Sequence, residues 1–141
     1  MEKIMILNSN ALDLQNLNDD LSKDYIVLAC NRATKALDLL SVFKPAALVL
    51  DPSALGLSTR EFVQKARALP QMTGLPVLAV TRVTTLRNIE ESFDWGVDVI
   101  FSKPVPTDRL RKRLETSLIR NRLLGQRGPT LALPTGPNSL V

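Results

Sequence analysis

Residues 45–51 read Pro-Ala-Ala-Leu-Val-Leu-Asp, a run of five apolar residues that ends in a carboxylate. Both faces of such a run are apolar, which is typical of a buried parallel strand covered by helices on either side. Pro45 can begin this strand, because its first position needs no ladder donor. Ligands of open parallel sheets bind at the carboxyl ends of the strands, which favours Asp51 as a functional residue. The sequence is equally compatible with an Asp51 that only begins a turn, as aspartates often do.

Four further apolar runs alternate with segments of helical periodicity. The runs are residues 4–7, 25–30, 76–81 and 97–102, and no hairpin signal joins them. The helical segments include residues 58–69 and a last helix over 107–124, which ends before Gly125. Five strands alternating with five helices predict an α/β fold, a doubly wound three-layer sandwich with right-handed crossovers.

Composition excludes several classes of protein. The chain has 141 residues, 45% of them hydrophobic, which fits one domain with a buried core. It has one cysteine and no histidine, so we expect no internal disulfide and no histidine ligand or acid/base group. Residues 4–7 are too short for a signal or membrane-spanning segment, and we expect a cytoplasmic protein without membrane association. No glycine-rich phosphate-binding pattern is present, which argues against a nucleotide enzyme.

The positive charge is concentrated at one end of the chain. Residues 1–102 hold 10 basic and 12 acidic side chains, whereas residues 103–141 hold 8 basic and 2 acidic ones. A solvated basic helix explains this pattern, and the alternative is a phosphate-binding surface. A small nucleic-acid-binding protein that uses this helix is the least favoured interpretation, because no reading motif is present.

Polar residues end two other predicted strands. Thr81 ends the strand over 76–81, and Lys103, followed by Pro104, comes after the strand over 97–102. Neighbouring parallel strands would bring Asp51, a hydroxyl and an ammonium to one edge of the sheet. Such a trio can hold a phosphoryl group, with the carboxylate as nucleophile and the other two groups binding its oxygens.

At these residues the sequence resembles the receiver domain of two-component response regulators, over about residues 3–122. Gly96-Val97-Asp98 and Glu61-Phe62 add to the resemblance. It implies the flavodoxin-like receiver fold, with a five-stranded parallel sheet in the order 2-1-3-4-5. It also implies that the phospho-acceptor is Asp51, that the switch hydroxyl is Thr81 and that the ammonium contacting the phosphate is Lys103.

The sequence departs from the family pattern where receivers carry an acidic pair that binds Mg²⁺. These positions are Asn8 and Ser9 here, so two of the three expected carboxylates are missing. We therefore expect an atypical, pseudo-receiver-like domain without a resident metal or cofactor. Any Mg²⁺ binding would be weak, with Asp51 as its only acidic ligand.

Three other positions are predicted to modulate the site. Arg82 replaces the small residue that usually follows the switch hydroxyl, and its guanidinium either pairs with Asp51 or points into solvent. Ile100 replaces the usual switch aromatic, although Phe101 is adjacent. Ser53 lies in the loop after the phospho-acceptor and is the third candidate.

The resemblance implies that partners or a second copy bind the face formed by the fourth helix, fifth strand and fifth helix. This face would carry four arginines and stand near Trp95; the arginines are Arg87, Arg109, Arg113 and Arg120. Expected partners are proteins: a sensor kinase, an output domain or another signalling protein.

The preferred hypothesis is a receiver-like domain over residues 1–124, followed by a flexible tail or linker over 125–141. It would not be an enzyme, and it would act mainly through protein–protein interaction with weak or absent Mg²⁺-dependent phosphorylation of Asp51. The alternative is a working phospho-receiver in a phosphorelay, in which Asp51, Thr81 and Lys103 suffice.

Overall fold

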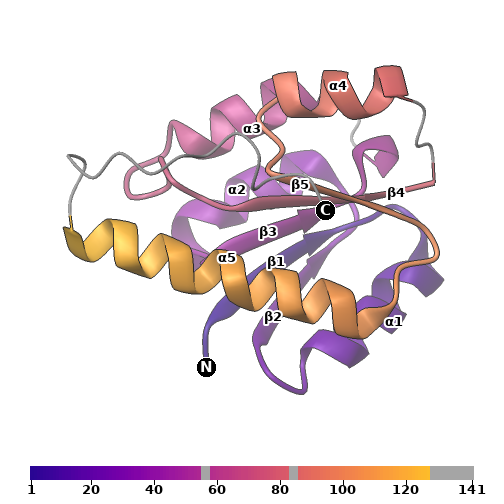
Figure 1. Cartoon of the computed structure of the whole chain (residues 1–141), viewed down its shortest axis with the longest axis horizontal. Coiled ribbons are helices and arrows are strands. Elements are labelled where there is room, and N and C mark those ends of the chain that lie inside the picture. The colour runs from indigo at the N-terminus through magenta and orange to yellow at the C-terminus, as the bar shows by residue number, and fades with distance from the viewer. Residues whose placement is uncertain (55–57, 83–85, 128–141) are drawn as a thin grey trace.

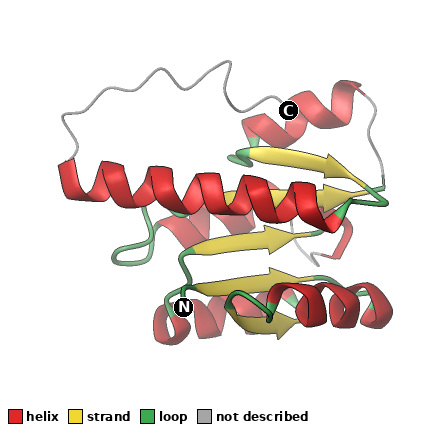
Figure 2. Ribbon diagram, turned by 60° about the horizontal axis from the view of Figure 1, so that its bottom comes forward, coloured by secondary structure: helices red, strands yellow, loops and turns green. Residues whose placement is uncertain are grey.

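The computed structural model describes residues 1–54, 58–82 and 86–127. The described residues form one sheet of five parallel strands in the order β2-β1-β3-β4-β5, as predicted. All the strand arrows in Figure 2 point the same way. The strands are β1 (Lys3–Leu7), β2 (Ile26–Cys30), β3 (Ala47–Leu50), β4 (Val77–Thr81) and β5 (Val99–Ser102).

Helices cover both faces of this sheet (Figure 1). The helix packed in front of the sheet in that view is α5, with α1 beside it, whereas α2 and α3 lie behind and α4 lies along the β5 edge. The helices are α1 (Ala11–Leu21), α2 (Ala33–Phe43), α3 (Thr59–Arg67), α4 (Leu86–Asp94) and α5 (Thr107–Arg127), and a 3₁₀ turn, η1, spans Pro52–Ala54. The predicted three-layer sandwich is therefore confirmed.

Side chains that alternate along the strands divide the core into two layers. Met5 and Leu48 pack with α2 and α3, whereas Ile4 and Val49 pack with α1 and α5. All four side chains are at most 1% exposed. Because both faces are buried, the strands lack the apolar–polar alternation of a half-exposed sheet.

The last helix is longer than predicted. We expected it to end at Leu124, but α5 continues through Gly125 to Arg127. One glycine near a helix end costs only about 1 kcal/mol relative to alanine, so it does not have to end the helix. The rest of the predicted tail, residues 128–141, lies outside the described residues. Among the described helices, none is both long and apolar enough to cross a membrane.

Arg67 on α3 ties the amino ends of β4 and β5 together. It donates to the carbonyl oxygens of Leu75 at 2.8 Å and Gly96 at 2.7 Å and pairs with Asp98 at 2.9 Å. Asp98 in turn accepts a hydrogen bond from the Val77 amide at 2.8 Å. The Gly96-Val97-Asp98 stretch thus has a structural role at the edge opposite the carboxyl ends of the strands.

Gly96→Ala is expected to lower the free energy of unfolding by about 2 kcal/mol. Gly96 has a φ of +95°, and a Cβ there would lie 2.9 Å from Arg67 Nη1 and 3.0 Å from Val63 Cγ1. Urea unfolding followed by circular dichroism measures the loss. Gly74→Ala is the matched control, because its Cβ would meet only the Asn121 side chain, at 3.2 Å, and it lacks the positive φ. Equal losses in the two variants would contradict the strain argument.

Candidate functional site

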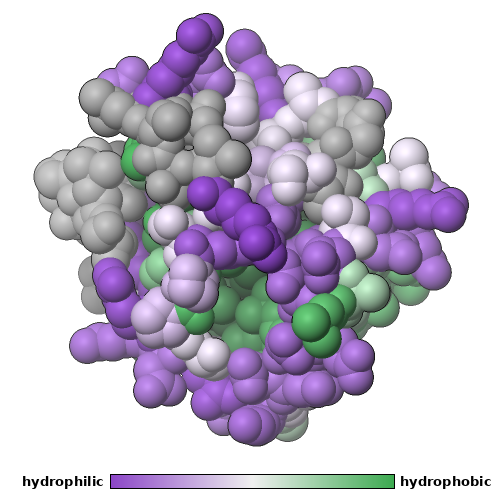
Figure 3. Space-filling model, turned by 90° about the vertical axis from the view of Figure 1, so that its right-hand side faces the viewer, coloured by the Kyte–Doolittle hydropathy of each residue, from purple (hydrophilic) through white to green (hydrophobic). Residues whose placement is uncertain are grey.

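The three predicted site residues lie at the carboxyl ends of neighbouring strands. Asp51 follows β3, Thr81 ends β4 and Lys103 follows β5. Backbone hydrogen bonds hold them at this edge: the amide of Lys103 donates to the carbonyl of Thr81 at 2.9 Å, and the amide of Asp51 donates to that of Leu7 at 3.0 Å. Figure 3 shows this end of the molecule.

Asp51 and Lys103 form a buried ion pair. Lys103 Nζ lies 2.6 Å from Asp51 Oδ2, and the two side chains are 13% and 8% exposed. Ser53 binds the other oxygen of Asp51, because its Oγ and its backbone amide donate to Oδ1 at 2.7 and 3.0 Å. Ser53 therefore contacts the predicted phospho-acceptor directly, and both oxygens of Asp51 have partners.

These contacts determine the ionisation of Asp51. Burial raises the pKa of its carboxyl, but the hydrogen bonds from Lys103 and Ser53 and the charge of Lys103 outweigh burial, so the pKa lies below its usual 3.8. Asp51 is consequently an anion at neutral pH, as a nucleophile or a phosphate acceptor requires.

The residues that replace the acidic pair differ in their placement. Asn8 is buried beside the site, and its Oδ1 accepts a hydrogen bond from the Asn10 amide at 2.9 Å. Ser9 is exposed. The carboxyl end of β1 thus brings an amide to the site and no charge.

Asp13 is a site residue that the sequence analysis missed. Its Oδ2 lies 3.1 Å from Lys103 Nζ, so the ammonium has a second carboxylate partner. Asp13 stands in the first turn of α1, whose N-cap is Asn10. A helix that begins directly behind a strand end presents its first turn to the same edge, and this signal was available in the sequence.

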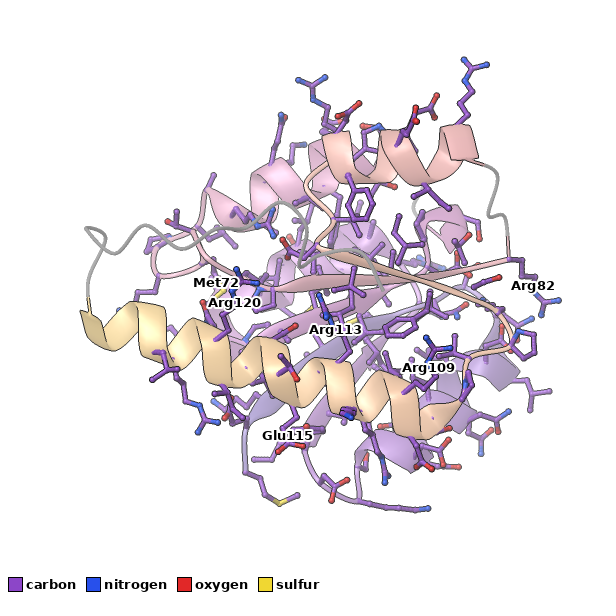
Figure 4. All side chains as sticks on the ribbon, viewed as in Figure 1. Met72, Arg82, Arg109, Arg113, Glu115 and Arg120 are labelled. Carbon is purple, nitrogen blue, oxygen red and sulfur yellow. The ribbon has the colours of Figure 1, made fainter. Side chains whose placement is uncertain are left out.

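Arg82 does not pair with Asp51, and that alternative of the prediction is wrong. Its guanidinium lies 3.7 Å from Asp13 Oδ2, and the side chain is 72% exposed. Figure 4 shows Arg82 projecting outward beyond the end of β4.

Ile100 and Phe101 lie on opposite faces of the sheet. Ile100 is partly buried against the core below α2 and α3, and Phe101 is buried against α5. Neighbouring residues of a strand point to opposite sides, so Phe101 does not replace the missing aromatic. Thr81 is 9% exposed at the end of β4.

A cavity of about 410 Å³ opens beside Asp51, between α1 and α5. The space-filling view in Figure 3 shows an apolar hollow surrounded by polar side chains. Apolar lining residues include Leu17, Val49, Val80, Val105 and Leu110, and polar ones include Asn8, Asp13, Asn16, Asp20, Asp51, Arg82 and Lys103.

The donors at this edge do not match a tight magnesium site. Mg²⁺ binds through carboxylates and waters in a near-ideal octahedron, but an ammonium lies between Asp13 and Asp51. Within the described residues, no group of three or more acidic, cysteine or histidine side chains could hold a metal ion.

The predicted partner face carries arginines on two helices. Arg87 on α4 is 88% exposed and pairs with Glu91 at 3.0 Å. In Figure 4, Arg109, Arg113 and Arg120 project from the side of α5 that is turned toward β5. Trp95 follows α4 and is partly buried.

Solved structures of receiver domains are similar to this chain. A CheY-like response regulator receiver domain protein from Methanospirillum hungatei matches with a TM-score of 0.78 and 21% identity, covering 87% of this chain and 98% of its own. One from Clostridium thermocellum has a TM-score of 0.78, 19% identity and the same two coverages. The chemotaxis protein CheY4 of Vibrio cholerae has a TM-score of 0.77 and 21% identity, covering 83% of this chain and 98% of its own.

These matches show that the fold is that of a response regulator receiver domain, as the sequence predicted. No protein-family model and no curated protein matches the sequence.

Proposed function

We propose that this chain, with its receiver-domain fold, works as an atypical signalling module that acts mainly through protein–protein interaction. The observation that carries the proposal is the buried 2.6 Å pair of Asp51 and Lys103 at the carboxyl edge of a 2-1-3-4-5 sheet. Parallel sheets bind their ligands at this edge, and the pair stands where the family resemblance puts the phospho-acceptor and its ammonium.

Weak or absent Mg²⁺-dependent phosphorylation follows from the charges around Asp51. Receivers use an acidic pair to hold the cation that offsets the charge of the arriving phosphoryl group, and Asn8 and Ser9 provide no charge there. Lys103 already neutralises Asp51. Any Mg²⁺ binding at this edge is therefore weak, and the chain needs no resident cofactor.

The partner is a protein: a sensor kinase, an output domain or another signalling protein. The face formed by α4, β5 and α5 is the proposed contact surface, for such a partner or for a second copy. A receiver is combined with an output enzyme in a similar solved structure, a response regulator receiver modulated diguanylate cyclase from Pelobacter carbinolicus. This chain itself is proposed to be a non-catalytic module of the cytoplasm.

A working phospho-receiver is the second candidate. The observation in its favour is the lowered pKa of Asp51, which keeps the nucleophile ionised next to Lys103. Nucleic-acid binding through α5 is less favoured, because two of its arginines pair internally. Arg111 contacts Asp24 at 3.4 Å, and Arg122 contacts Glu2 at 3.2 Å.

Treatment with acetyl phosphate separates the first two candidates. The protein is incubated with the donor, with and without Mg²⁺, and its intact mass is measured. We expect little gain of a phosphoryl group in either condition. Ready Mg²⁺-dependent labelling that Asp51→Asn abolishes would overturn the proposal and establish the working phospho-receiver.

A further inference from the structure

The ammonium of Lys103 is shared by two carboxylates from different elements. Asp51 after β3 binds it at 2.6 Å, and Asp13 on α1 binds it at 3.1 Å. The same Oδ2 of Asp13 also lies 3.7 Å from Arg82. The two negative and two positive side chains balance each other.

An oxyanion that approaches Asp51 needs these cations. Lys103 and Arg82 are the cationic side chains that line the cavity beside Asp51, within the part of the chain that the structure describes. Both are already paired with Asp13. A phosphate ion would therefore bring uncompensated negative charge into contact with two carboxylates, and like charges at such short range repel strongly.

We propose that Asp13 is a tethered blocker that occupies Lys103 and Arg82 and so excludes oxyanions such as phosphate from the Asp51 site. This inference rests on the proposed function and gives its site a regulatory residue. An event that draws Asp13 away from Lys103, such as a partner binding α1, would open the site to an oxyanion.

Asp13 is better suited to this role than Asp51. Its side chain is 29% exposed, compared with 8% for Asp51. Asp51 is also held by Ser53, whereas the contacts seen for the Asp13 carboxylate are those to Lys103 and Arg82. Asp13 can therefore move away while the buried pair beneath it stays intact.

The test is the affinity for inorganic phosphate, measured by NMR from the amide resonances of Ser53 and Lys103. Asp13→Asn keeps the shape of the side chain and removes its charge, so we expect phosphate to bind at least about tenfold more tightly than to the unchanged protein. The matched control is Asp19→Asn, an exposed position on the same helix, which should leave the affinity unchanged.

Adding Lys103→Met to Asp13→Asn should abolish the gain, because the ammonium, released from Asp13 while still paired with Asp51, is the expected anchor. Asp13→Ser repeats the test with a second neutral side chain and should give the same gain. A gain no larger in Asp13→Asn and Asp13→Ser than in Asp19→Asn would overturn the inference.

Phosphate affinity does not depend on covalent transfer, so this test is separate from that of the proposed function. Tighter phosphate binding by the Asp13→Asn protein would support the blocking role of Asp13, whether or not Asp51 becomes labelled. Ready labelling of the unchanged protein would instead contradict the proposed function. The comparison of phosphate affinities would still decide whether Asp13 excludes phosphate from the site.

Discussion

Replacing Lys103 with methionine is expected to lower the free energy of unfolding at pH 7 by about 3 kcal/mol. The substitution leaves Asp51 buried and ionised with no cation against it, and the neighbouring carboxylate of Asp13 adds repulsion. Breaking a buried pair from one side costs more than the pair contributes, because the remaining charge has lost its hydration. Urea unfolding monitored by circular dichroism measures the loss.

The loss should depend on pH in a defined direction. In the unchanged protein the pKa of Asp51 is lowered below 3.8, so its contribution to stability is present above that pH and is lost as the pH falls through the folded value. Without Lys103, burial should raise the pKa of Asp51, and protonation then relieves the buried charge. The difference in stability between the two proteins should therefore be largest near pH 7 and shrink toward pH 4.

The matched control is Lys65→Met, which breaks an exposed pair with Glu61 on α3. Exposed pairs contribute little, so its cost should stay within about 0.5 kcal/mol at every pH. A Lys103→Met loss that does not change with pH would show that Lys103 acts through packing alone.

Restoring the acidic pair with Asn8→Asp and Ser9→Asp is expected to raise the affinity for Mg²⁺ by about 100-fold or more. Two new carboxylates at the end of β1 would join Asp51, and each attracts a dication by several kcal/mol before desolvation is counted. Crowding three carboxylates should lower stability without metal, and Mg²⁺ should restore it by binding the folded state. Calorimetric titration and thermal unfolding with and without Mg²⁺ measure both effects.

The control variant Thr73→Asp with Thr116→Asp adds the same charge at two exposed positions in separate segments, and its Mg²⁺ affinity should not change. Because Arg82 contacts Asp13 and not Asp51, Arg82→Ala is not required for metal binding. In this variant the bound Mg²⁺ compensates the charge of the phosphoryl group, so Arg82 is no longer needed as a cation. Adding Arg82→Ala then removes a bulky side chain from the approach to Asp51 and should increase labelling by acetyl phosphate. Tight Mg²⁺ binding by the unchanged protein would contradict the view that its metal site is weakened.

The layers of the fold were predictable because they depend on local patterns, whereas the order of the strands was implied by the family resemblance. An apolar run such as residues 46–50 needs cover on both faces, wherever its neighbours lie. Helical stripes and caps such as Ser58 depend on residues within one or two turns. The end of α5 was placed wrongly at Leu124, because ending a helix a few residues earlier or later changes its free energy only slightly.

The place of Asp51, Thr81 and Lys103 was also predictable. Each follows or ends a strand, and parallel strands bring such residues to one edge whatever the helices between them do. Ser53 was a candidate for the same reason, since it stands two residues after Asp51.

The sequence by itself therefore determined that the strands form a buried parallel sheet, that the site lies at the carboxyl ends of the strands, and which residues stand at those ends. Only the tertiary structure decided which charges meet there. Asp13 and Lys103 are 90 residues apart, and their contact depends on how α1 docks against the sheet. Arg82 likewise lies beside Asp13 and not beside Asp51, although all three residues line the same edge of the sheet. Ion pairing depends on distances of a few ångströms between separate elements, and no local pattern in the chain specifies those distances.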